Sequence, residues 1–296
     1  MEYDLTHKTY VITGATSGIG LATAQALVRC GADLIGIGRS RERCRAAEHQ
    51  LRALNPTASI TYLAGDLSLQ SEVRALAGAI RAALAEAGKT SLDGLVNNAG
   101  TFTYWLALTA EGYETQWAVN HLAPFLLTHE LLPLLQAAPA ARVVTVSSDS
   151  HYGVNLNWED IQLRRHYDGL RAYGQTKLAN ILFTLALNQH LGAGSALRAF
   201  AADPGLVKTE IGFKGTPALV RWVWGLRRSG GVAPEVPAEG ILYLLAEPGL
   251  QGNAQVYWKQ SAPKQSSRQA RDTAAAQRLW AISERRCGLE GELPHV

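Results

Sequence analysis

Near its N-terminus the chain reads Thr13-Gly14-Ala15-Thr16-Ser17-Gly18-Ile19-Gly20. Residues 8–13 before this stretch are typical of a short buried strand, and residues 21–28 after it repeat their apolar side chains at helical spacing. A glycine-rich turn between a strand and a helix presents backbone N–H groups and the positive helix end to a pyrophosphate. Gly14 allows the tight turn, and the other two glycines carry no side chain that would block the phosphates. The alternative is an ordinary strand-to-helix loop.

The rest of the chain alternates strand-like and helix-like segments. This alternation predicts an α/β fold, a Rossmann doubly wound parallel sheet of about seven strands with helices on both faces, in a single domain over residues 1–296. Strands are predicted near residues 8–13, 33–37, 59–64, 92–97, 141–147, 196–202 and 254–258. Helices are predicted near residues 18–30, 40–54, 69–87, 110–136, 170–191, 237–246 and 271–286, the last in a C-terminal tail at 266–296.

Composition excludes several classes of protein. The 296 residues are 47% hydrophobic, which is enough for a substantial core. The net charge of +3 is small and scattered, so nothing favours a nucleic-acid partner. Three cysteines lie far apart without a Cys-x-x-Cys pair, which predicts free thiols and no metal site. No apolar run reaches the length of a membrane span and residues 1–8 do not resemble a signal peptide, so we expect a cytoplasmic protein.

Tyr173 and Lys177 are the most informative pair of residues for function. They are four residues apart, so in a helix over residues 170–190 both side chains project from one face. A phenol beside a fixed ammonium can donate and accept a proton, and the cation favours the phenolate, which predicts a depressed pKa for Tyr173. Tyr167 and Arg171 share this offset, but the charge of arginine cannot be tuned. The alternative is an exposed ion-pair spacing on a solvated helix.

Together these features resemble the short-chain dehydrogenase/reductase family. The glycine spacing is that of the family, and further matches follow in order over residues 8 to about 258. They are Asp66-Leu67 after the third strand, Asn97 to Gly100 after the fourth, Asn120 in a long helix, Ser147-Ser148 after the fifth, Tyr173 with Lys177, and Pro204-Gly205 after the sixth. The ordered series is more specific than any single match, because each motif must fall after its own strand or helix.

The resemblance implies a role for each matched residue. Tyr173 would be the acid/base, and Lys177 would lower its pKa and hold the nicotinamide ribose. Ser148 would hydrogen-bond the substrate oxygen, although Ser147 and Ser150 are also candidates from the residues alone. Asn120 would hold a water that links the lysine to solvent. The implied cofactor contacts are Gly14, Thr16, Ser17, Gly18, Ile19, Gly20, Arg39, Ser40, Asp66, Leu67, Asn98, Ala99, Gly100, Tyr173, Lys177, Pro204, Gly205, Val207 and Thr209.

The residues after the second strand favour NADP over NAD. An acidic residue there would accept hydrogen bonds from the ribose hydroxyl of NAD and repel a 2′-phosphate. This chain has Gly38-Arg39-Ser40 instead, with Arg43 close by. Arg39 can form bidentate hydrogen bonds with a phosphate. Alternatively, Arg39 stacks on the adenine of either cofactor. Asp66 would accept a hydrogen bond from the adenine amino group, or would cap the helix that follows it.

Two stretches bear on the substrate. The interval from Ser148 to Tyr173 is longer than usual in the family and resembles the branch of retinol dehydrogenases and related carbonyl reductases. So do residues 119–128, 177–183 and 278–280. Residues 206–236 fall where the family places a substrate lid. Because the candidate lining residues are apolar or aromatic, we expect a hydrophobic carbonyl or alcohol substrate. The resemblance also implies a homodimer or homotetramer.

Other functions are weaker candidates. A serine hydrolase would need Gly-x-Ser-x-Gly after a strand, which is missing from the sequence. A non-catalytic NADP-binding sensor on the same fold would typically lack the tyrosine or the lysine. Residues 217–228 mix two tryptophans with three arginines, which is compatible with a membrane-surface dehydrogenase acting on a retinoid or another lipid. The lid interpretation accounts for the same apolar residues without a membrane.

Overall fold

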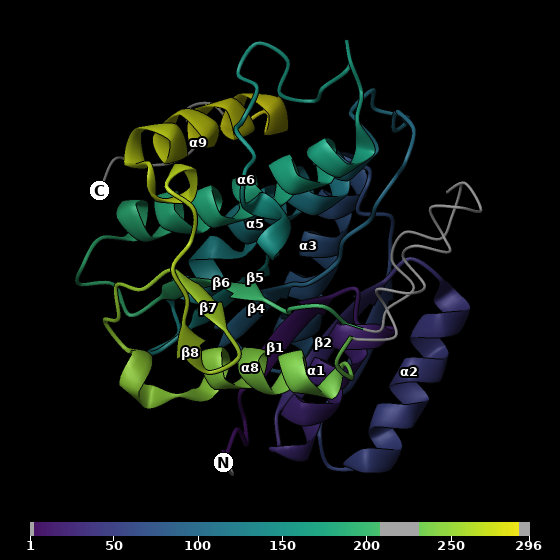
Figure 1. Ribbon diagram of the computed structural model, residues 1–296. Coiled ribbons are helices and arrows are strands. Elements are labelled where there is room, and N and C mark those ends of the chain that lie inside the picture. The colour runs from purple at the N-terminus through teal and green to yellow at the C-terminus, as the bar shows by residue number, and fades with distance from the viewer. Residues whose placement is uncertain (1–2, 208–230, 290–296) are drawn as a thin grey trace.

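The fold is built on one sheet (Figure 1), and the computed structural model describes residues 3–207 and 231–289. The strand order is β3-β2-β1-β4-β5-β6-β7-β8, and all neighbours pair in parallel except β7 and β8. This arrangement confirms the doubly wound α/β fold. The strands are β1 (Thr9–Thr13), β2 (Asp33–Gly38), β3 (Ile60–Ala64), β4 (Gly94–Asn97), β5 (Arg142–Val146), β6 (Arg198–Asp203), β7 (Tyr257–Lys259) and β8 (Ala262–Pro263).

Helices cover both faces of the sheet. In Figure 1, α3, α5 and α6 lie over one face, with α9 outside α6, and α1, α2 and α8 lie over the other. The α-helices are α1 (Gly18–Arg29), α2 (Arg41–Leu54), α3 (Gln70–Glu86), α4 (Thr115–Trp117), α5 (Ala123–Gln136), α6 (Gly169–Leu191), α8 (Glu235–Ala246) and α9 (Thr273–Cys287). A π-helical segment, η1 (Ala118–Leu122), joins α4 to α5, and short 3-10 turns are η2 (Asp149–His151), η3 (Pro248–Leu250) and η4 (Gln269–Arg271).

The two-sided cover explains the apolar strands. In β1, Val11 packs into the core under α3, α5 and α6, whereas Tyr10 and Ile12 pack into the core under α1 and α8. All three side chains are almost fully buried. A strand covered on both faces needs apolar residues at consecutive positions, and the alternation of a one-sided strand is therefore missing here.

The predicted elements agree with the structure apart from shifted ends, of which the largest is in the last predicted strand, expected near 254–258 and found at Tyr257–Lys259. Two differences go further. The helix predicted over residues 110–136 begins at Thr115 and is interrupted by the π-helical turn that carries Asn120. The structure also adds β8, which pairs antiparallel with β7 at the edge of the sheet. Two residues, one of them a proline, give no strand signal in sequence, because proline removes a ladder donor and is tolerated at edges.

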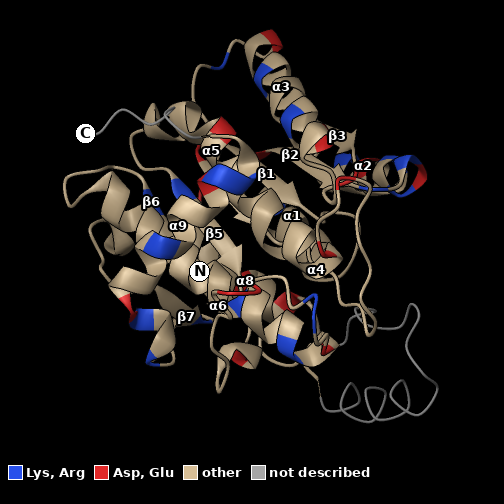
Figure 2. Ribbon diagram, turned by 90° about the horizontal axis from the view of Figure 1, so that it is seen from above, with Lys and Arg blue, Asp and Glu red and all other residues tan. Residues whose placement is uncertain are grey.

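In the view of Figure 2, the positions of Lys and Arg are interspersed along the ribbon with those of Asp and Glu, as the small, scattered net charge predicts. Within residues 3–207 and 231–289, no helix has the length and apolar character needed to cross a bilayer.

Candidate active site

The predicted motifs meet at one edge of the sheet. The glycine turn follows β1, Arg39 follows β2, Asn98 follows β4, Ser148 follows β5 and Pro204 follows β6. Parallel strands place their carboxyl ends together, and ligands of open α/β sheets bind outside those ends, where the strand order reverses. Here the order reverses between β1 and β4.

The glycine turn fits a dinucleotide phosphate. Gly14 and Gly18 have φ of 67° and 54°, in the left-handed region that favours glycine. Ser17 precedes α1, but its hydroxyl accepts no hydrogen bond from the helix, and no acidic residue occupies the first turn. The first N–H groups of α1 therefore lack a side-chain cap and suit an anion. Ile19 lies in the core with its side chain buried, so its backbone alone faces this anion position.

Gly20 has a packing role beside the one predicted. A Cβ atom at Gly20 would lie 2.3 Å from the Gly14 carbonyl oxygen and 2.4 Å from Nδ2 of Asn98. A Cβ atom at Gly14 would likewise lie 2.9 Å from Nδ2 of Asn98. The lack of a side chain at Gly20 is thus required first by the protein's own packing between the turn and the residue after β4, whatever space the phosphates need.

Asn98 fastens the turn to the neighbouring strand. Its Nδ2 donates to the Thr13 carbonyl at 2.9 Å, and its backbone N–H donates to Oγ1 of Thr13 at 3.0 Å. The backbone N–H of Ala99 donates to the same hydroxyl at 3.0 Å. These bonds hold the partly exposed segment from Asn98 to Gly100 beside the glycine turn. The side chain of Asn98 therefore positions the turn.

Arg39 is exposed at the end of β2. It makes no ion pair or hydrogen bond with any residue in the described ranges 3–207 and 231–289. Thr16 of the glycine turn lies over this strand end, since a Cβ atom at Gly38 would lie 2.4 Å from its Cγ2. Ser40 caps α2, because its Oγ accepts from the Arg43 backbone N–H at 3.3 Å, and its hydroxyl proton is left to donate.

Asp66 and Leu67 lie after β3, beside the same edge. The carboxylate of Asp66 accepts from the Ser68 N–H at 2.9 Å, and its own N–H donates to Glu72 at 2.6 Å. Asp66 does not cap α3, whose N-cap position is Leu69. The side chain of Leu67 is partly buried against the core. Both residues are thus held by local contacts in a fixed turn.

Tyr173 and Lys177 project from the same face of α6. The Lys177 Nζ atom lies 5.3 Å from the centroid of the Tyr173 ring and donates to the Val146 carbonyl at 3.1 Å. The lysine is buried, with 4% of its surface exposed, and the tyrosine is partly buried. Phe102 packs edge-on against the Tyr173 ring, with 6.0 Å between ring centroids.

The predicted depression of the Tyr173 pKa is wrong for the protein in this state. Burial, followed by the negative charge of Asp203, raises the pKa of Tyr173 to about 12. Burial alone lowers the pKa of Lys177 to about 8. Removing water from both groups disfavours the phenolate and the ammonium alike, and this cost exceeds their mutual attraction. At neutral pH the phenol of Tyr173 therefore keeps its proton.

Asn120 lies near the lysine, next to Gly100. A Cβ atom at Gly100 would lie 3.5 Å from Oδ1 of Asn120 and 3.7 Å from Nζ of Lys177, so the three residues are neighbours. Asn120 exchanges hydrogen bonds with the backbone of Thr101 at 2.7 and 2.9 Å, and its Nδ2 donates to Oγ1 of Thr176 at 3.1 Å. It occupies the π-helical turn η1, and such turns are frequent at functional sites.

The structure separates the three candidate serines. Ser147 is buried, and its hydroxyl donates to the Lys177 carbonyl at 2.7 Å, so it fastens β5 to α6. Ser148 is partly exposed, and its Oγ accepts from the Ser150 N–H at 3.1 Å and contacts the Ser150 hydroxyl at 3.2 Å. Of these serines, Ser148 is the one at the strand end with a hydroxyl that is neither buried nor committed to α6.

The segment after β6 is described only in part. Gly205 has φ of 68°, and its N–H donates to the Asp203 carboxylate at 2.9 Å. Val207 pairs with Val232 in a parallel bridge. Thr209, and the lid predicted at 206–236 over most of its length, lie outside the described residues.

Sequence reasoning missed Asp203 and Lys264. Asp203 is the last residue of β6 and is buried, and Lys264 follows β8 and forms ion pairs with Asp203 and Asp149. Nothing in the sequence connects these residues, because 61 positions separate Asp203 from Lys264. An aspartate directly before Pro204-Gly205 was the one available signal.

The comparisons with known proteins agree with this geometry. Residues 8–217 match the family model described as short chain dehydrogenase. The chain therefore belongs to the short-chain dehydrogenase/reductase family of oxidoreductases.

Three relatives illustrate its place in the family. Human dehydrogenase/reductase SDR family member 13 is 36% identical over 295 residues, which cover 97% of this chain and 74% of that protein. Human retinol dehydrogenase 14 is 35% identical over 295 residues, which cover 95% of this chain and 87% of that protein. The crystal structure of an uncharacterized protein from Mycobacterium paratuberculosis is 34% identical and aligns over 97% of this chain and 96% of its own, with a TM-score of 0.72. This chain is thus similar to the retinol dehydrogenase branch that its long interval before Tyr173 suggested.

Proposed function

We propose that this protein is an NADP-dependent oxidoreductase that transfers a hydride between nicotinamide and a hydrophobic carbonyl or alcohol, with Tyr173 as the acid/base. The observation that carries the proposal is the buried Lys177 ammonium, 5.3 Å from the Tyr173 ring centroid and adjacent to Gly100 and Asn120. A lysine on a solvated helix face would extend into water. A buried lysine beside a phenol, at the edge where the strands end, is what proton transfer requires.

The residues divide the chemistry between them. When bound, a nicotinamide cofactor supplies or accepts the hydride. Tyr173 then donates or accepts the proton at the substrate oxygen, and Ser148 donates a hydrogen bond to that oxygen as negative charge develops. Lys177 stabilises the phenolate once the proton has left, and Asn120 holds a water that connects the lysine to solvent. At neutral pH the Tyr173 phenol is protonated, which is the form that donates the proton in the reducing direction.

NADP is favoured over NAD by the charge at the end of β2. Arg39 is exposed there, without a partner in the described ranges, and a carboxylate for the ribose hydroxyl of NAD is missing from the Gly38-Arg39-Ser40 stretch. The first turn of α1 would hold the pyrophosphate through its free N–H groups. Asp66 and Leu67 would line the adenine, and the segment from Asn98 to Gly100 would lie along the ribose.

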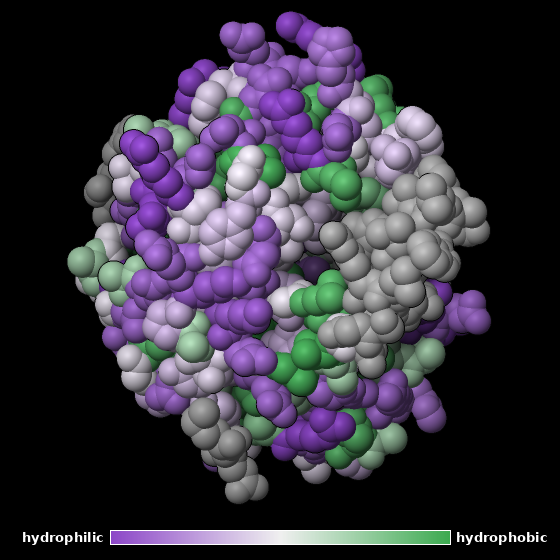
Figure 3. Space-filling model, in the orientation of Figure 1, coloured by the Kyte–Doolittle hydropathy of each residue, from purple (hydrophilic) through white to green (hydrophobic). Residues whose placement is uncertain are grey.

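A hydrophobic substrate fits the surface next to Tyr173. Phe102 contacts the Tyr173 ring, and the loop that follows it exposes large apolar side chains: Trp105 is 66% exposed and Leu108 is 53% exposed. Leu206, after β6, is also exposed. Figure 3 shows hydrophobic side chains gathered around a hollow on the face of the molecule seen in Figure 1. Because apolar burial contributes about 25 cal/mol per Å², affinity should rise with the apolar area of the substrate.

The test is turnover of reduced nicotinamide with matched substrates. We expect oxidation of NADPH by bulky apolar aldehydes and ketones, a much slower reaction with NADH, and little reaction with charged sugars or keto acids. Binding of NADPH without turnover of any carbonyl or alcohol would instead favour a non-catalytic sensor on this fold.

A retinoid or similar lipid is a second candidate substrate, with the protein acting at a membrane surface. The exposed Trp105, Leu106 and Leu108 favour it, together with the similarity to retinol dehydrogenases. Tryptophan and leucine side chains bury readily at a lipid interface. Co-sedimentation with vesicles, compared between the native protein and a Trp105→Ser variant, would separate the two candidates. Residues 217–228, which also suggested a membrane contact, lie outside the described residues.

A further inference from the structure

The chain after β8 crosses the loop that carries Ser148. In Figure 1 it runs from the edge of the sheet toward α9. We call residues 262–267 the strap and residues 147–152 the serine loop. The Tyr152 hydroxyl donates to the Gln265 carbonyl, and the Ser267 N–H donates to Nε2 of His151 at 3.1 Å. The strap therefore contacts the serine loop at two places, Gln265 and Ser267.

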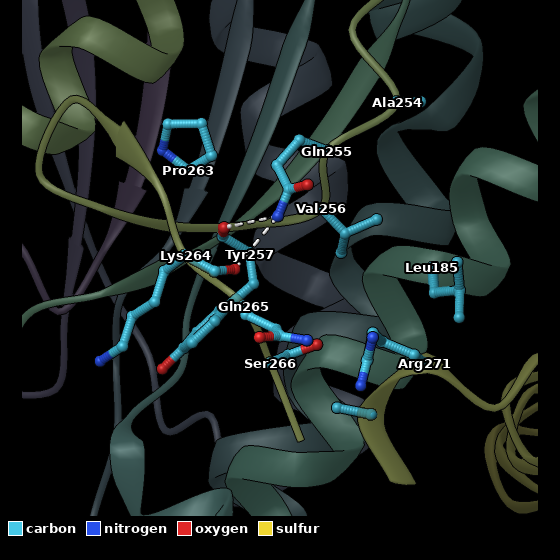
Figure 4. A pocket seen from close by; sticks show the side chains of 11 residues that line it. Leu185, Ala254, Gln255, Val256, Tyr257, Pro263, Lys264, Gln265, Ser266 and Arg271 are labelled. Carbon is cyan, nitrogen blue, oxygen red and sulfur yellow. Dashed lines mark hydrogen bonds between the residues drawn. The ribbon is translucent and has the colours of Figure 1, made fainter. Parts of the chain in front are cut away.

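Lys264 makes the charged contact of the strap. Its Nζ lies 2.5 Å from the Asp149 carboxylate and 2.7 Å from the Asp203 carboxylate. Figure 4 shows the Lys264 side chain beside that of Tyr257, both directed away from Leu185 and Arg271. The Tyr257 hydroxyl also donates to Asp149, at 3.3 Å. One ammonium thus joins the residue after Ser148 to the last residue of β6.

The two carboxylates differ in burial. The side chain of Asp203 is 1% exposed, whereas that of Asp149 is 49% exposed. A buried carboxylate needs a partner, and the Gly205 N–H together with the Lys264 ammonium supplies it. Asp149 could be solvated instead, so its contact with Lys264 is not needed for burial. What the contact does is hold the serine loop against β6.

His151 completes the attachment. Its Nε2 accepts from the strap, so Nδ1 carries the proton and donates to the Ser148 carbonyl at 2.7 Å. The ring is fully buried against Tyr152 and Tyr257, and burial lowers its pKa. The neutral ring therefore ties the backbone of Ser148 to Ser267.

We propose that Lys264 is a positioning residue, which holds the serine loop against the end of β6 and so places the Ser148 hydroxyl for the reaction. The inference rests on the proposed role of Ser148. It adds a residue that lies beyond the part of the chain matched by the family model, residues 8–217.

Lys264 also acts on the electrostatics of Tyr173. The charge of Asp203 raises the pKa of Tyr173, and the ammonium of Lys264 opposes that charge. Without it, the phenolate would be less stable and its pKa would rise further. The charged and titratable groups facing the ammonium are Asp149, Asp203, Tyr257, Tyr152 and His151, with Lys259 acting on Asp149. Tyr173 itself faces Lys177 and Asp203.

The experiment compares Lys264→Met with Lys264→Arg and with Lys89→Met. Methionine keeps the apolar stem and removes the charge, whereas arginine keeps the charge. Lys89 is the matched control, because it is 24% exposed against 23% for Lys264 and pairs with Asp33 at the opposite, amino-terminal end of the strands. For each variant we would measure kcat and KM with NADPH and an apolar carbonyl, the pH profile of alcohol oxidation, and hydrogen exchange of residues 147–152 without ligand.

We expect Lys264→Met to lower kcat by about tenfold or more, since misplacement of about 1 Å can cost about 10²-fold. The pKa seen in the pH profile of alcohol oxidation should rise, and hydrogen exchange in the serine loop should become faster. Lys264→Arg should restore most of each effect. Lys89→Met should lower the stability of the protein but leave kcat, the pH profile and exchange in the serine loop unchanged. A Lys264→Met enzyme that resembles Lys89→Met, with native kcat, pH profile and loop exchange, would overturn the proposal.

If Lys264→Met does not fold, Asp149→Asn tests the same proposal. This variant weakens the contact of Lys264 with the serine loop but leaves the ion pair between Lys264 and Asp203. Faster exchange in the serine loop with a lower kcat supports the proposal, and native values for both refute it. The exchange measurement needs no turnover. If the native protein were inactive, the proposed function would fail while faster loop exchange in these variants would still show that Lys264 holds the loop.

Discussion

The Nζ atom of Lys177 lies 5.3 Å from the centroid of the Tyr173 ring, with the lysine buried and the tyrosine partly buried at the edge where the strands end. The cation therefore stands against the face of the phenol ring while its Nζ donates to the Val146 carbonyl at 3.1 Å. This geometry fixes the lysine through the end of β5, so β5 and α6 together determine where the tyrosine and the lysine meet.

Tyr173→Phe should abolish proton transfer without unfolding the protein. The change removes one hydroxyl, so NADPH binding should survive while turnover falls by about 10²-fold or more. Tyr167→Phe is the matched control. The Tyr167 hydroxyl bonds Gln116 at 2.8 Å and Glu114 at 2.9 Å, away from Lys177, and its loss should cost about 1 kcal/mol of stability with turnover retained. Steady-state kinetics and urea unfolding check both; near-native turnover of Tyr173→Phe would mean that the proton donor is elsewhere.

Arg39→Asp should level or reverse the preference for NADPH over NADH. A charge-assisted hydrogen bond contributes about 1.5–3 kcal/mol, so the native preference should be at least about tenfold. Arg29→Asp makes the same charge change in the last turn of α1, at the opposite end from the glycine turn, and should leave the preference unchanged. Isothermal titration with both cofactors measures each affinity. Equal affinities in the native protein would contradict the assignment.

Gly20→Ala should disrupt the cofactor turn. Its Cβ atom would lie within 2.4 Å of the Gly14 carbonyl oxygen and of Nδ2 of Asn98, and neither contact can relax without moving the turn. We expect weaker NADPH binding and a lower melting temperature. Gly78→Ala, in α3 with nothing within 4 Å of the new Cβ atom, should instead stabilise the protein by about 0.5–1 kcal/mol. If the melting temperatures of Gly20→Ala and Gly78→Ala shifted in the same direction, the close packing of Gly20 against Gly14 and Asn98 would be contradicted.

Stability should fall in acid partly because of His121. Burial lowers its pKa from 6.5 to about 3, so the unfolded chain binds a proton that the folded protein refuses. The contribution of neutral His121 to the free energy of unfolding is fully present above pH 6.5. It is lost as the pH falls toward 3, by at most about 1.4 kcal/mol per pH unit. His121→Gln should flatten this slope while lowering stability at neutral pH, whereas His166→Gln, at an exposed position, should not. Urea unfolding between pH 7 and pH 4 measures how the free energy of unfolding changes with pH. The same slope in the native protein and in His121→Gln would show that the idea is wrong.

The sequence by itself determined the class of fold and most members of the candidate site. The alternation of apolar segments and the glycine turn are local patterns, and a strand or helix forms where its own residues favour it. The motifs after β1, β4, β5 and β6 then had to meet, because parallel strands share one carboxyl edge. The parallel sheet and the helices on both of its faces followed from the same signals.

The tertiary structure decided what depends on contacts between distant residues. It showed that Gly20 is constrained by Asn98, that Ser147 is fastened to Lys177 while Ser148 is not, and that burial raises the pKa of Tyr173. It also brought Lys264 to Asp149 across 115 positions. Steric room, desolvation and ion pairing depend on distances in space, and a one-dimensional pattern of residues does not carry those distances until the sheet has brought the strand ends together.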